Sequence, residues 1–253
     1  MLSEERRREI VSLLRTQGRV LVSDLSKHFR TSQITIRKDL EYLHHQGQLE
    51  RTHGGALPNE AGALKDSPLQ EKARQHRQEK VRIAAAAARM VRPGQVIILD
   101  SGTTNTTIAR ACRNIQNLTI ITNATNIAAE LADSAVEVIL TGGVLRKNSF
   151  SLVGPLAEDS LRKLSADLLF LGVDGFDVSY GLTTPNIHEA RVNRIMAECA
   201  RRTIVVCDSS KFGRRRLCLI LPTSSVHETI TDKAIAKQDL KALRESNIDV
   251  TLV

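Results

Sequence analysis

Apolar residues recur at helical spacing three times within the first 45 residues of the chain. Residues three and four positions apart fall on one side of a helix, so each run predicts a short helix with one buried face. Ser3 and Ser32 can cap the first and third helices, Gly18 can end the first, and the second covers residues 22–29. The buried positions expected in the three helices are Ile10, Leu13 and Leu14, then Leu25 and Phe29, and finally Ile36, Leu40 and Leu43.

The polar side of the third helix carries side chains suited to a DNA groove. Arginine can donate to both acceptors on a guanine edge, glutamine can pair with adenine, and lysine or threonine can hold phosphate oxygens. This chemistry predicts a helix that reads duplex DNA, whereas the alternative interpretation is a solvated basic helix in an ordinary bundle. The residues that we assign to DNA on this helix are Ser32, Gln33, Thr35, Arg37 and Lys38.

A short strand and a glycine turn follow the third helix. Residues 48–51 are typical of a strand, and His53-Gly54-Gly55 forms a turn whose missing side chains would let the backbone approach a sugar-phosphate strand. Helices, turn and strand in this order predict a winged helix-turn-helix domain over residues 1–57. The residues assigned to DNA in this wing are Arg51, His53 and Gly54.

Beyond residue 70 short apolar runs alternate with amphipathic segments. This alternation predicts an α/β domain with a largely parallel sheet over residues 71–253, opened by a long helix over residues 71–91 and preceded by a linker over residues 58–70. The strands expected are residues 96–99, 119–122, 137–140, 168–173, 203–207, 217–221 and 250–252. The other helices expected are residues 106–113, 126–132, 157–164, 188–201 and 239–245.

Length and charge add to this picture. A chain of 253 residues with 42% hydrophobic content is long enough for two domains. Its formal net charge is +8, and residues 1–92 hold 18 Lys and Arg against 11 Asp and Glu. Most of this excess lies in residues 61–92 and not in the helix-turn-helix segment. Such charge favours a polyanion through counterion release, with a solvated basic helix as the alternative.

Composition also argues against other classes of protein. No apolar run reaches membrane-spanning length, and the first residues lack a signal-peptide pattern, so we expect a cytoplasmic protein without membrane contact. The four cysteines show no close pairing and no Cys/His ligand spacing, so we expect buried thiols, no metal and no cofactor. The lack of Trp and the 3% aromatic content disfavour a stacking platform for single-stranded nucleic acid.

Polar residues gather at the carboxyl ends of the predicted strands, where open parallel sheets bind ligands. Residues 100–105 leave the first strand and open a helix, so they offer backbone donors, hydroxyls and a positive helix end to a phosphate, although plain capping is the alternative. Carboxylates and an ammonium at later strand ends suit sugar hydroxyls, phosphate or proton transfer, with caps or surface ion pairs as the alternative. The candidate binding residues are Asp100, Ser101, Gly102, Thr103, Thr104, Thr122, Asn123, Gly142, Gly143, Arg146, Asp174, Glu189 and Lys211.

Both segments resemble the DeoR family of bacterial transcriptional regulators. The likeness is carried in the first domain by residues 32–40 and 51–56, and in the second by residues 100–104, 122–123, 141–143, 172–175, 189–191 and 208–212. The resemblance implies an effector domain similar to ribose-5-phosphate isomerase and CoA-transferase folds. It also implies that residues 101–104 bind a phosphate with help from Lys211, and that Asp174 and Glu189 meet polar groups of a sugar. Residues 173–175 look more like those of amino-sugar and galactosamine repressors than those of glycerol phosphate repressors.

We therefore expect a repressor that binds double-stranded operator DNA and responds to a phosphorylated sugar or amino sugar. Helix-turn-helix proteins usually present two copies to two half-sites, so a homodimer or tetramer is expected. One alternative is a sugar-phosphate isomerase or deaminase, with Asp174 or Glu189 as base and Lys211 holding the substrate. Fusion to a DNA-reading domain favours the sensor. Another alternative is a nonspecific nucleoid protein, which would bind operator and random duplex equally.

Overall fold

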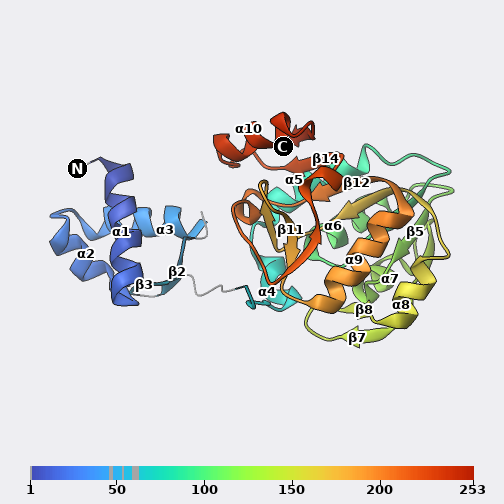
Figure 1. Ribbon diagram of the computed structural model, residues 1–253, viewed down its shortest axis with the longest axis horizontal. Helices are drawn as coiled ribbons and strands as arrows, with labels where there is room; N and C mark the ends of the chain where they lie inside the picture. Colours follow the sequence, from blue (N-terminus) through green and yellow to red (C-terminus); the bar gives the residue numbers. More distant parts are fainter. Residues whose placement is uncertain (1, 46–47, 53, 59–62) are drawn as a thin grey trace. The chain divides into compact units, whose positions relative to one another are not determined.

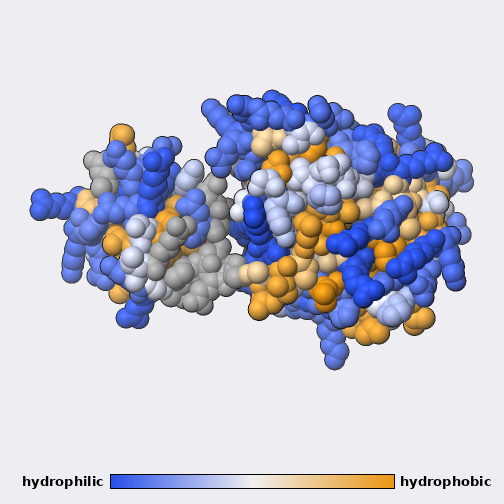
Figure 2. Space-filling model, viewed as in Figure 1, coloured by the Kyte–Doolittle hydropathy of each residue, from blue (hydrophilic) through white to orange (hydrophobic). Residues whose placement is uncertain are grey.

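The computed structural model describes residues 2–45, 48–52, 54–58 and 63–253. The chain divides into two compact units, Met1–Lys65 and Asp66–Val253 (Figure 1). Polar and charged side chains cover much of the visible surface, and exposed apolar side chains gather mainly on the second unit (Figure 2). Within the described part of the chain, none of the helices has the length and hydropathy that a membrane span requires.

Three helices and a small antiparallel sheet make up the first unit. The helices pack around a core in which Ile10, Ile36 and Leu40 are fully buried and Leu25 and Leu43 nearly so. The predicted helix-turn-helix with an adjoining strand hairpin is thus confirmed. The helices are α1 (Ser3–Gln17), α2 (Val22–His28) and α3 (Gln33–His45), and the strands are β1 (Val20–Leu21), β2 (Leu49–Thr52) and β3 (Gly55–Pro58), in the order β1-β3-β2.

The two predicted serine caps have different outcomes. The hydroxyl oxygen of Ser32 accepts a hydrogen bond from the N–H of Thr35 at 3.1 Å, as a helix cap does. Ser3, in contrast, does not cap α1, because the helix begins at Ser3 itself and Leu2 holds the cap position. The N–H of Leu2 donates to the carboxylate of Glu5 at 3.1 Å, so a side chain inside the first turn satisfies the backbone there.

A parallel sheet of seven strands forms the centre of the second unit, in the order β15-β14-β12-β9-β4-β5-β6. The predicted strands 96–99, 119–122 and 137–140 match β4, β5 and β6 at both ends. The expected α/β fold is therefore confirmed. The strands are β4 (Val96–Leu99), β5 (Thr119–Thr122), β6 (Glu137–Leu140), β9 (Ala166–Leu171), β12 (Ala200–Val206), β14 (Glu228–Thr231) and β15 (Asp249–Leu252).

Helices cover both faces of this sheet (Figure 1). Along β4, Ile97 and Leu99 join one apolar core and Ile98 joins the other, as strand alternation requires. The first core includes residues of α5, α6 and α7, and the second includes residues of α8, α9 and α10. These helices are α5 (Arg77–Ala88), α6 (Thr103–Cys112), α7 (Thr125–Leu131), α8 (Pro155–Leu161), α9 (Ile187–Cys199) and α10 (Lys237–Glu245).

Strand β4 comes first in the chain among the seven strands, yet it lies in the middle of the sheet. Its neighbours are β5 on one side and β9 on the other. The chain therefore builds one half of the sheet outward from β4 and returns to build the other half from β9. The carboxyl end of β4 is a topological switch point, the place where open parallel sheets bind ligands.

Several strands differ from the sequence prediction. The predicted strand 217–221 forms β13, which pairs antiparallel with β11 and lies outside the parallel sheet. The place beside β12 belongs instead to β14, which was missed because three of its four residues are Glu or Thr. Other missed strands form a hairpin and a small sheet: β7 (Val144–Arg146), β8 (Ser151–Val153), β10 (Gly175–Asp177) and β11 (Gly181–Thr184), with β13 (Cys218–Leu221) completing the sheet.

The long helix predicted over residues 71–91 is wrong, because two helices occupy it: α4 (Leu69–Arg74) and α5. Gln75 is extended, and His76 has φ +51°, a left-handed conformation that separates them. The ammonium of Lys80 donates to the carbonyl oxygens of Lys72 at 2.5 Å and of Gln75 at 2.6 Å. A side chain one turn into α5 thus satisfies the backbone that the break exposes.

Candidate functional site

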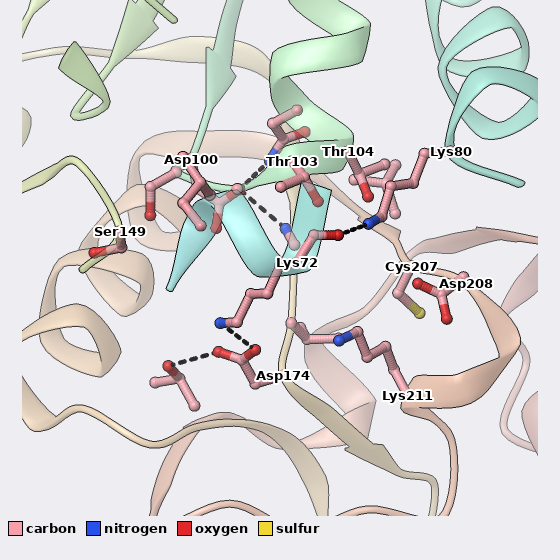
Figure 3. Close-up of a pocket in the computed structure, with 18 of the residues that line it drawn as sticks. Lys72, Lys80, Asp100, Thr103, Thr104, Ser149, Asp174, Cys207, Asp208 and Lys211 are labelled. Atoms are coloured by element: carbon pink, nitrogen blue, oxygen red, sulfur yellow. Dashed lines mark hydrogen bonds and ion pairs between the residues drawn. The ribbon is translucent and has the colours of Figure 1, made fainter. Parts of the chain in front are cut away.

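A pocket opens at the carboxyl end of β4 in the second unit (Figure 3). Its space, including the open mouth, is about 790 Å³, which suits a small metabolite. The groups that line it include the beginning of α6, several carboxylates, and three lysines. This mixture favours a ligand that carries both an anionic group and hydrogen-bond donors.

The turn from β4 into α6 forms the first wall. Strand β4 ends at Leu99, and Gly102 has φ +143° directly before α6 begins at Thr103, a conformation that favours glycine. The first N–H groups of α6 have no acceptor within the helix, and the helix dipole makes this end positive. Ser101, Thr103 and Thr104 add hydroxyls, so this wall suits a phosphate.

Asp100 lies buried at the base of this wall. Its Oδ1 accepts hydrogen bonds from the N–H of Gly172, at 3.0 Å, and from the side-chain amide of Asn105. Its Oδ2 accepts one from Nδ2 of Asn193 at 3.5 Å. Burial raises the pKa of Asp100 well above its usual range, and the negative charge of Glu189 raises it further. The side-chain oxygens of Asn105 and Asn193 accept no hydrogen bond within the described residues, so the pocket wall holds two buried acceptors.

Two carboxylates, those of Asp174 and Glu189, form the second wall. The hydroxyl of Thr184 links them, lying 3.5 Å from Oδ2 of Asp174 and 3.3 Å from Oε2 of Glu189. Glu189 is held further by the hydroxyl of Ser151 at 2.9 Å and the guanidinium of Arg146 at 3.0 Å. Carboxylates fixed in this way present acceptors to the hydroxyl or ammonium groups of a ligand.

Lysine side chains balance these carboxylates. Nζ of Lys72 lies 2.6 Å from Oδ1 of Asp174. Burial alone would raise the pKa of Asp174, but the ammonium groups of Lys72 and Lys211 outweigh it and hold the pKa below its usual range. Lys211 also lowers the pKa of Asp208, so its charge lies near both carboxylates (Figure 3). Burial lowers the pKa of Lys80 to about 8, against the opposing effect of Asp208.

The pocket brings together most of the predicted binding residues. Their position next to one another is what the strand-end argument expects, and their part in binding stays a prediction. The predicted residues that line the pocket are Asp100, Ser101, Gly102, Thr103, Thr104, Asp174, Glu189 and Lys211.

Thr122, Asn123 and Arg146 do not line the pocket. The hydroxyl of Thr122 accepts a hydrogen bond from the backbone after it, and Nδ2 of Asn123 donates to the carbonyl of Leu152 at 3.1 Å, so both shape the turn that follows β5. Arg146 lies one contact behind the pocket, where its guanidinium holds Glu189.

Gly142 and Gly143 also lie outside the lining. Both have positive φ, at +73° and +118°, so they turn the chain after β6. A Cβ on Gly143 would lie 2.7 Å from the carbonyl oxygen of Val153, which shows that this glycine permits close packing against β8. Both glycines thus turn the backbone, and their part in binding stays a prediction.

Sequence reasoning missed several lining residues. Lys72 and Lys80 belong to the basic segment 61–92, whose excess charge alone predicts a polyanion contact or a solvated helix, although both lysines line the pocket. The excess positive charge of this segment was the feature of the sequence that could have indicated lysines in the binding site. The other residues missed are Leu69, Gln75, His76, Asn105, Ser149, Gly172, Val173, Thr184, Asn193, Val206, Cys207 and Asp208.

The four cysteines are free thiols, of which Cys112 and Cys207 are buried. Burial raises the pKa of Cys207 well above its usual range, so its thiol is protonated at the edge of the pocket. No group of three or more His, Cys, Asp or Glu among the described residues could hold a metal ion.

In the first unit, the outer side of α3 faces solvent. Gln33, Arg37 and Lys38 are exposed, whereas Ile36 and Leu40 on the other side are buried. The hydroxyl oxygens of Ser32 and Thr35 lie 2.9 Å apart at the start of the helix. The predicted DNA-facing side chains of α3 thus share one accessible side, and their contact with DNA stays a prediction.

Asp39 fixes α3 against α1. Its carboxylate is buried and accepts hydrogen bonds from Nε of Arg6 at 2.6 Å and from Nε of Arg7 at 2.8 Å. The guanidinium of Arg7 also lies 3.8 Å from the centre of the Tyr42 ring. These contacts involve the inward and lateral sides of α3, so the outer side stays available.

The predicted wing residues have different surroundings. Arg51 forms an ion pair with Glu41 of α3, while Gly54 is exposed, and its carbonyl accepts a hydrogen bond from the N–H of Val22 at 2.9 Å. His53 lies outside the described residues, and its predicted contact with DNA stays a prediction. An ion pair between wing and helix keeps Arg51 beside the exposed side of α3.

Gly55 has a structural role in the small sheet, and its predicted approach to DNA stays a prediction. A Cβ at this position would lie 2.0 Å from the carbonyl oxygen of Val20. Gly55 pairs with Leu21 in the register of β1 and β3, so the absent side chain lets these two strands meet.

Two family models match the chain. The model of a DeoR-like helix-turn-helix domain matches residues 6–61, and the model of a DeoR C terminal sensor domain matches residues 75–233. The first match covers α3 and the wing, and the second covers most of the pocket.

Full-length relatives agree with these matches. A putative aga operon transcriptional repressor from Escherichia coli O157:H7 is 42% identical over 253 residues, which cover 99% of this chain and 94% of the relative. The HTH-type transcriptional regulator GlpR of Haloferax volcanii is 37% identical over 250 residues, which cover 99% and 98%. Ribose 5-phosphate isomerase A from Methanocaldococcus jannaschii is a distant structural neighbour, with a TM-score of 0.42 at 17% identity over 55% of each chain.

Proposed function

This chain belongs to the DeoR family and is a DNA-binding transcriptional regulator with a sugar-phosphate sensor domain, and on that premise we propose that its effector is a phosphorylated amino sugar. The observation that carries the proposal is the shared pocket of Asp174 and the N-terminus of α6. One end suits a phosphate and the other suits a cation.

The phosphate end rests on three kinds of donor. The free N–H groups and hydroxyls at the start of α6 form the wall, and the ammonium of Lys211 lies near the carboxylates that face it. Backbone donors at a helix terminus together with a lysine suit a tetrahedral dianion. A phosphate bound here would leave the rest of the sugar beside Asp174 and Glu189.

The two carboxylates of the pocket support the proposal that the effector carries an amino group. Two fixed carboxylates within reach of one hydroxyl, that of Thr184, concentrate negative charge where a neutral sugar offers only hydroxyls. The lowered pKa of Asp174 keeps that group ionised at neutral pH. An ionised, partly buried carboxylate binds an ammonium more strongly than a hydroxyl.

The first unit is proposed to contact operator DNA through α3 and the wing. Its exposed side chains suit base edges and phosphates. Because helix-turn-helix proteins read paired half-sites, we propose a homodimer or tetramer joined through the second unit. Sedimentation with and without operator tests this, and a monomer under both conditions would overturn it.

The pocket is proposed to sense its ligand without converting it. A base for proton abstraction works best with a pKa near the operating pH, whereas Lys72 and Lys211 hold the pKa of Asp174 low. Both oxygens of Glu189 accept hydrogen bonds from neighbouring side chains. Assays for isomerisation of ribose 5-phosphate and for ammonia release from glucosamine 6-phosphate test this, and turnover at ordinary enzyme rates would contradict it.

The effector is tested by anisotropy titration of a duplex that the protein selects from random sequence. The complex is challenged with glucosamine 6-phosphate, galactosamine 6-phosphate, their neutral hexose counterparts and ribose 5-phosphate. We expect an amino-sugar phosphate to change DNA affinity at concentrations where the matching hexose phosphate does not. A response to neutral sugars alone, or to none, would refute the proposed effector.

A further inference from the structure

The second unit opens with residues 66–74, a segment that we name the strap, which is tied to the hairpin behind the pocket. Nδ2 of Asn148 donates to the carbonyl oxygen of Asp66 at 2.8 Å, and the N–H of Leu69 donates to the carbonyl oxygen of Asn148 at 2.9 Å. The carboxylate of Asp66 forms an ion pair with Arg146, the residue that also holds Glu189. The beginning of the strap is thus fixed next to the carboxylates of the pocket.

Farther along, Lys72 carries the strap into the pocket itself. Its ammonium lies 2.6 Å from Oδ1 of Asp174 (Figure 3). It also lies 3.9 Å from Oδ1 of Asp66. Its side chain is 23% exposed, so this is a partly buried pair and not a surface one. The backbone carbonyl of Lys72 is held in turn by Lys80, at 2.5 Å.

The position of this ammonium matters because Asp174 is the carboxylate best placed for a cationic ligand group. In the structure Lys72 already neutralises it. The charges of Lys211 and Arg216 also stabilise this carboxylate, but its side chain is ion-paired with Lys72, and loss of an ion-pair partner from a partly buried carboxylate is costly. A ligand that takes Asp174 must therefore bring a positive charge of its own.

Building on the proposed function, we propose that Lys72 is an internal stand-in for the ammonium group of the effector. An amino sugar exchanges one cation for another at Asp174, so the buried charge stays balanced. A neutral sugar offers only hydroxyls and leaves the pair with Lys72 in place. Lys72 thereby sets the selectivity of the pocket between amino-sugar phosphates and neutral sugar phosphates.

Displacement of Lys72 has a mechanical consequence. Of the side chains in the strap, it is the one that pairs with Asp174, and its release leaves the strap held by the ion pair of Asp66 with Arg146 and by its backbone bonds to Asn148 and Lys80. The strap directly follows the segment that joins the two units in the chain. Ligand binding therefore loosens the first residues of the sensor unit.

The test compares wild type with Lys72→Met, which keeps an unbranched apolar side chain and removes the ammonium group. Lys163→Met, at an exposed position outside the pocket, is the matched control. Calorimetry measures the affinity of each full-length protein for glucosamine 6-phosphate and for glucose 6-phosphate, two ligands that differ in the amino group. Hydrogen exchange of residues 66–76 is followed with and without each sugar.

We expect Lys72→Met to bind glucosamine 6-phosphate about fivefold tighter or more, because the internal competitor is gone, with less than about a twofold change for glucose 6-phosphate. We also expect faster exchange in residues 66–76 in two cases: wild type with glucosamine 6-phosphate, and Lys72→Met without sugar. Lys163→Met should match wild type throughout.

Changes in sugar affinity or in hydrogen exchange that differ from these would overturn the proposal. Weaker binding of both sugars by Lys72→Met would make Lys72 an ordinary ligand for the phosphate. Unchanged exchange in sugar-free Lys72→Met would show that the pair does not hold the strap. If wild type bound neither sugar, the proposed function would fail, and the sugar-free exchange would still decide whether Lys72 restrains the strap.

Discussion

The ammonium of Lys80 lies 2.6 Å from the carbonyl oxygen of Gln75, at the residue where α4 gives way to α5. One buried side chain thereby satisfies a break that no glycine or proline marks. The same burial lowers the pKa of Lys80 to about 8, so this group titrates within an accessible pH range.

The first prediction concerns this titration. Below pH 8 the folded protein bears the full cost of the buried ammonium, whereas between about 8 and 10.5 the unfolded chain holds this proton more tightly than the folded one. The free energy of unfolding of wild type, relative to Lys80→Met, should therefore rise by up to about 1.4 kcal/mol per pH unit in that window. Urea unfolding at a series of pH values measures the difference.

Neutral Lys80 keeps two N–H donors, so both carbonyl bonds can persist at high pH. A difference between wild type and Lys80→Met that stayed flat from pH 7 to 10 would contradict the lowered pKa.

The second prediction concerns Asp100, whose pKa burial raises well above its usual range. The folded state retains this proton at pH values where the unfolded chain has lost it, so its contribution to stability is complete below about pH 4 and declines as pH rises. Asp100→Asn lacks this dependence and keeps an acceptor for the N–H of Gly172. Relative to this variant, the unfolding free energy of wild type should fall by up to about 1.4 kcal/mol per pH unit above pH 4. A parallel pH dependence of the two proteins would argue against a raised pKa.

The third prediction concerns the exposed side of α3. Arg37→Ala should weaken operator binding by about 1 to 3 kcal/mol and relax specificity at one base pair, if this arginine reads a base. Lys38→Ala should weaken binding to all sequences and reduce the salt slope by about 1, as loss of one phosphate contact does. Arg8→Ala, which removes an equal charge from α1, is the control in the same anisotropy titrations. Unchanged affinity in Arg37→Ala would remove that residue from the interface.

The fourth prediction separates sensing from DNA binding. Lys211→Met should lower the affinity for the effector about tenfold or more, because a charged donor to the phosphate is lost, and Thr103→Val should lower it less. Neither should change operator affinity without sugar, since both residues line the pocket of the second unit. Calorimetry and anisotropy measure the two affinities. A loss of DNA binding in either variant would indicate a structural role.

Much of the fold was accessible from local patterns. Strand β4 matches its predicted bounds because Val96 to Leu99 form an uninterrupted apolar run between turn residues, which is typical of a strand buried on both faces. The buried face of α3 was predicted for a similar reason, since Ile36, Leu40 and Leu43 recur at helical spacing.

Other features could not be predicted locally, because they depend on contacts that form only in the folded chain or on polar residues that are buried against their usual preference. The break at His76 is hidden because helix formers surround it, and the bonds from Lys80 exist only after the chain has folded. Strand β14 was missed because Thr229 and Thr231 are buried polar residues, for which a local pattern gives no sign of burial.

In the candidate site, too, local sequence patterns predict some residues, whereas others depend on residues far away in the chain. The strand-end rule identified the residues after β4 and β9, but it applied equally to those after β5 and β6. Only the first two flank the switch point, whereas Asn123 closes its turn against Leu152. Lys72 could not be placed at all, because its neighbour Asp174 lies 102 residues away in the sequence.

The location of the strap determines where the DNA-binding and sensor units of such regulators can be separated and joined to units of other regulators. The sensor unit begins at Asp66, ahead of its first long helix, so a fragment started at α5 would lack Lys72 and Leu69 and leave Asp174 without its paired lysine. Hybrid regulators that exchange DNA-reading halves should therefore be joined no later than Lys65, since a later junction would import the selectivity of the donor protein along with its operator preference.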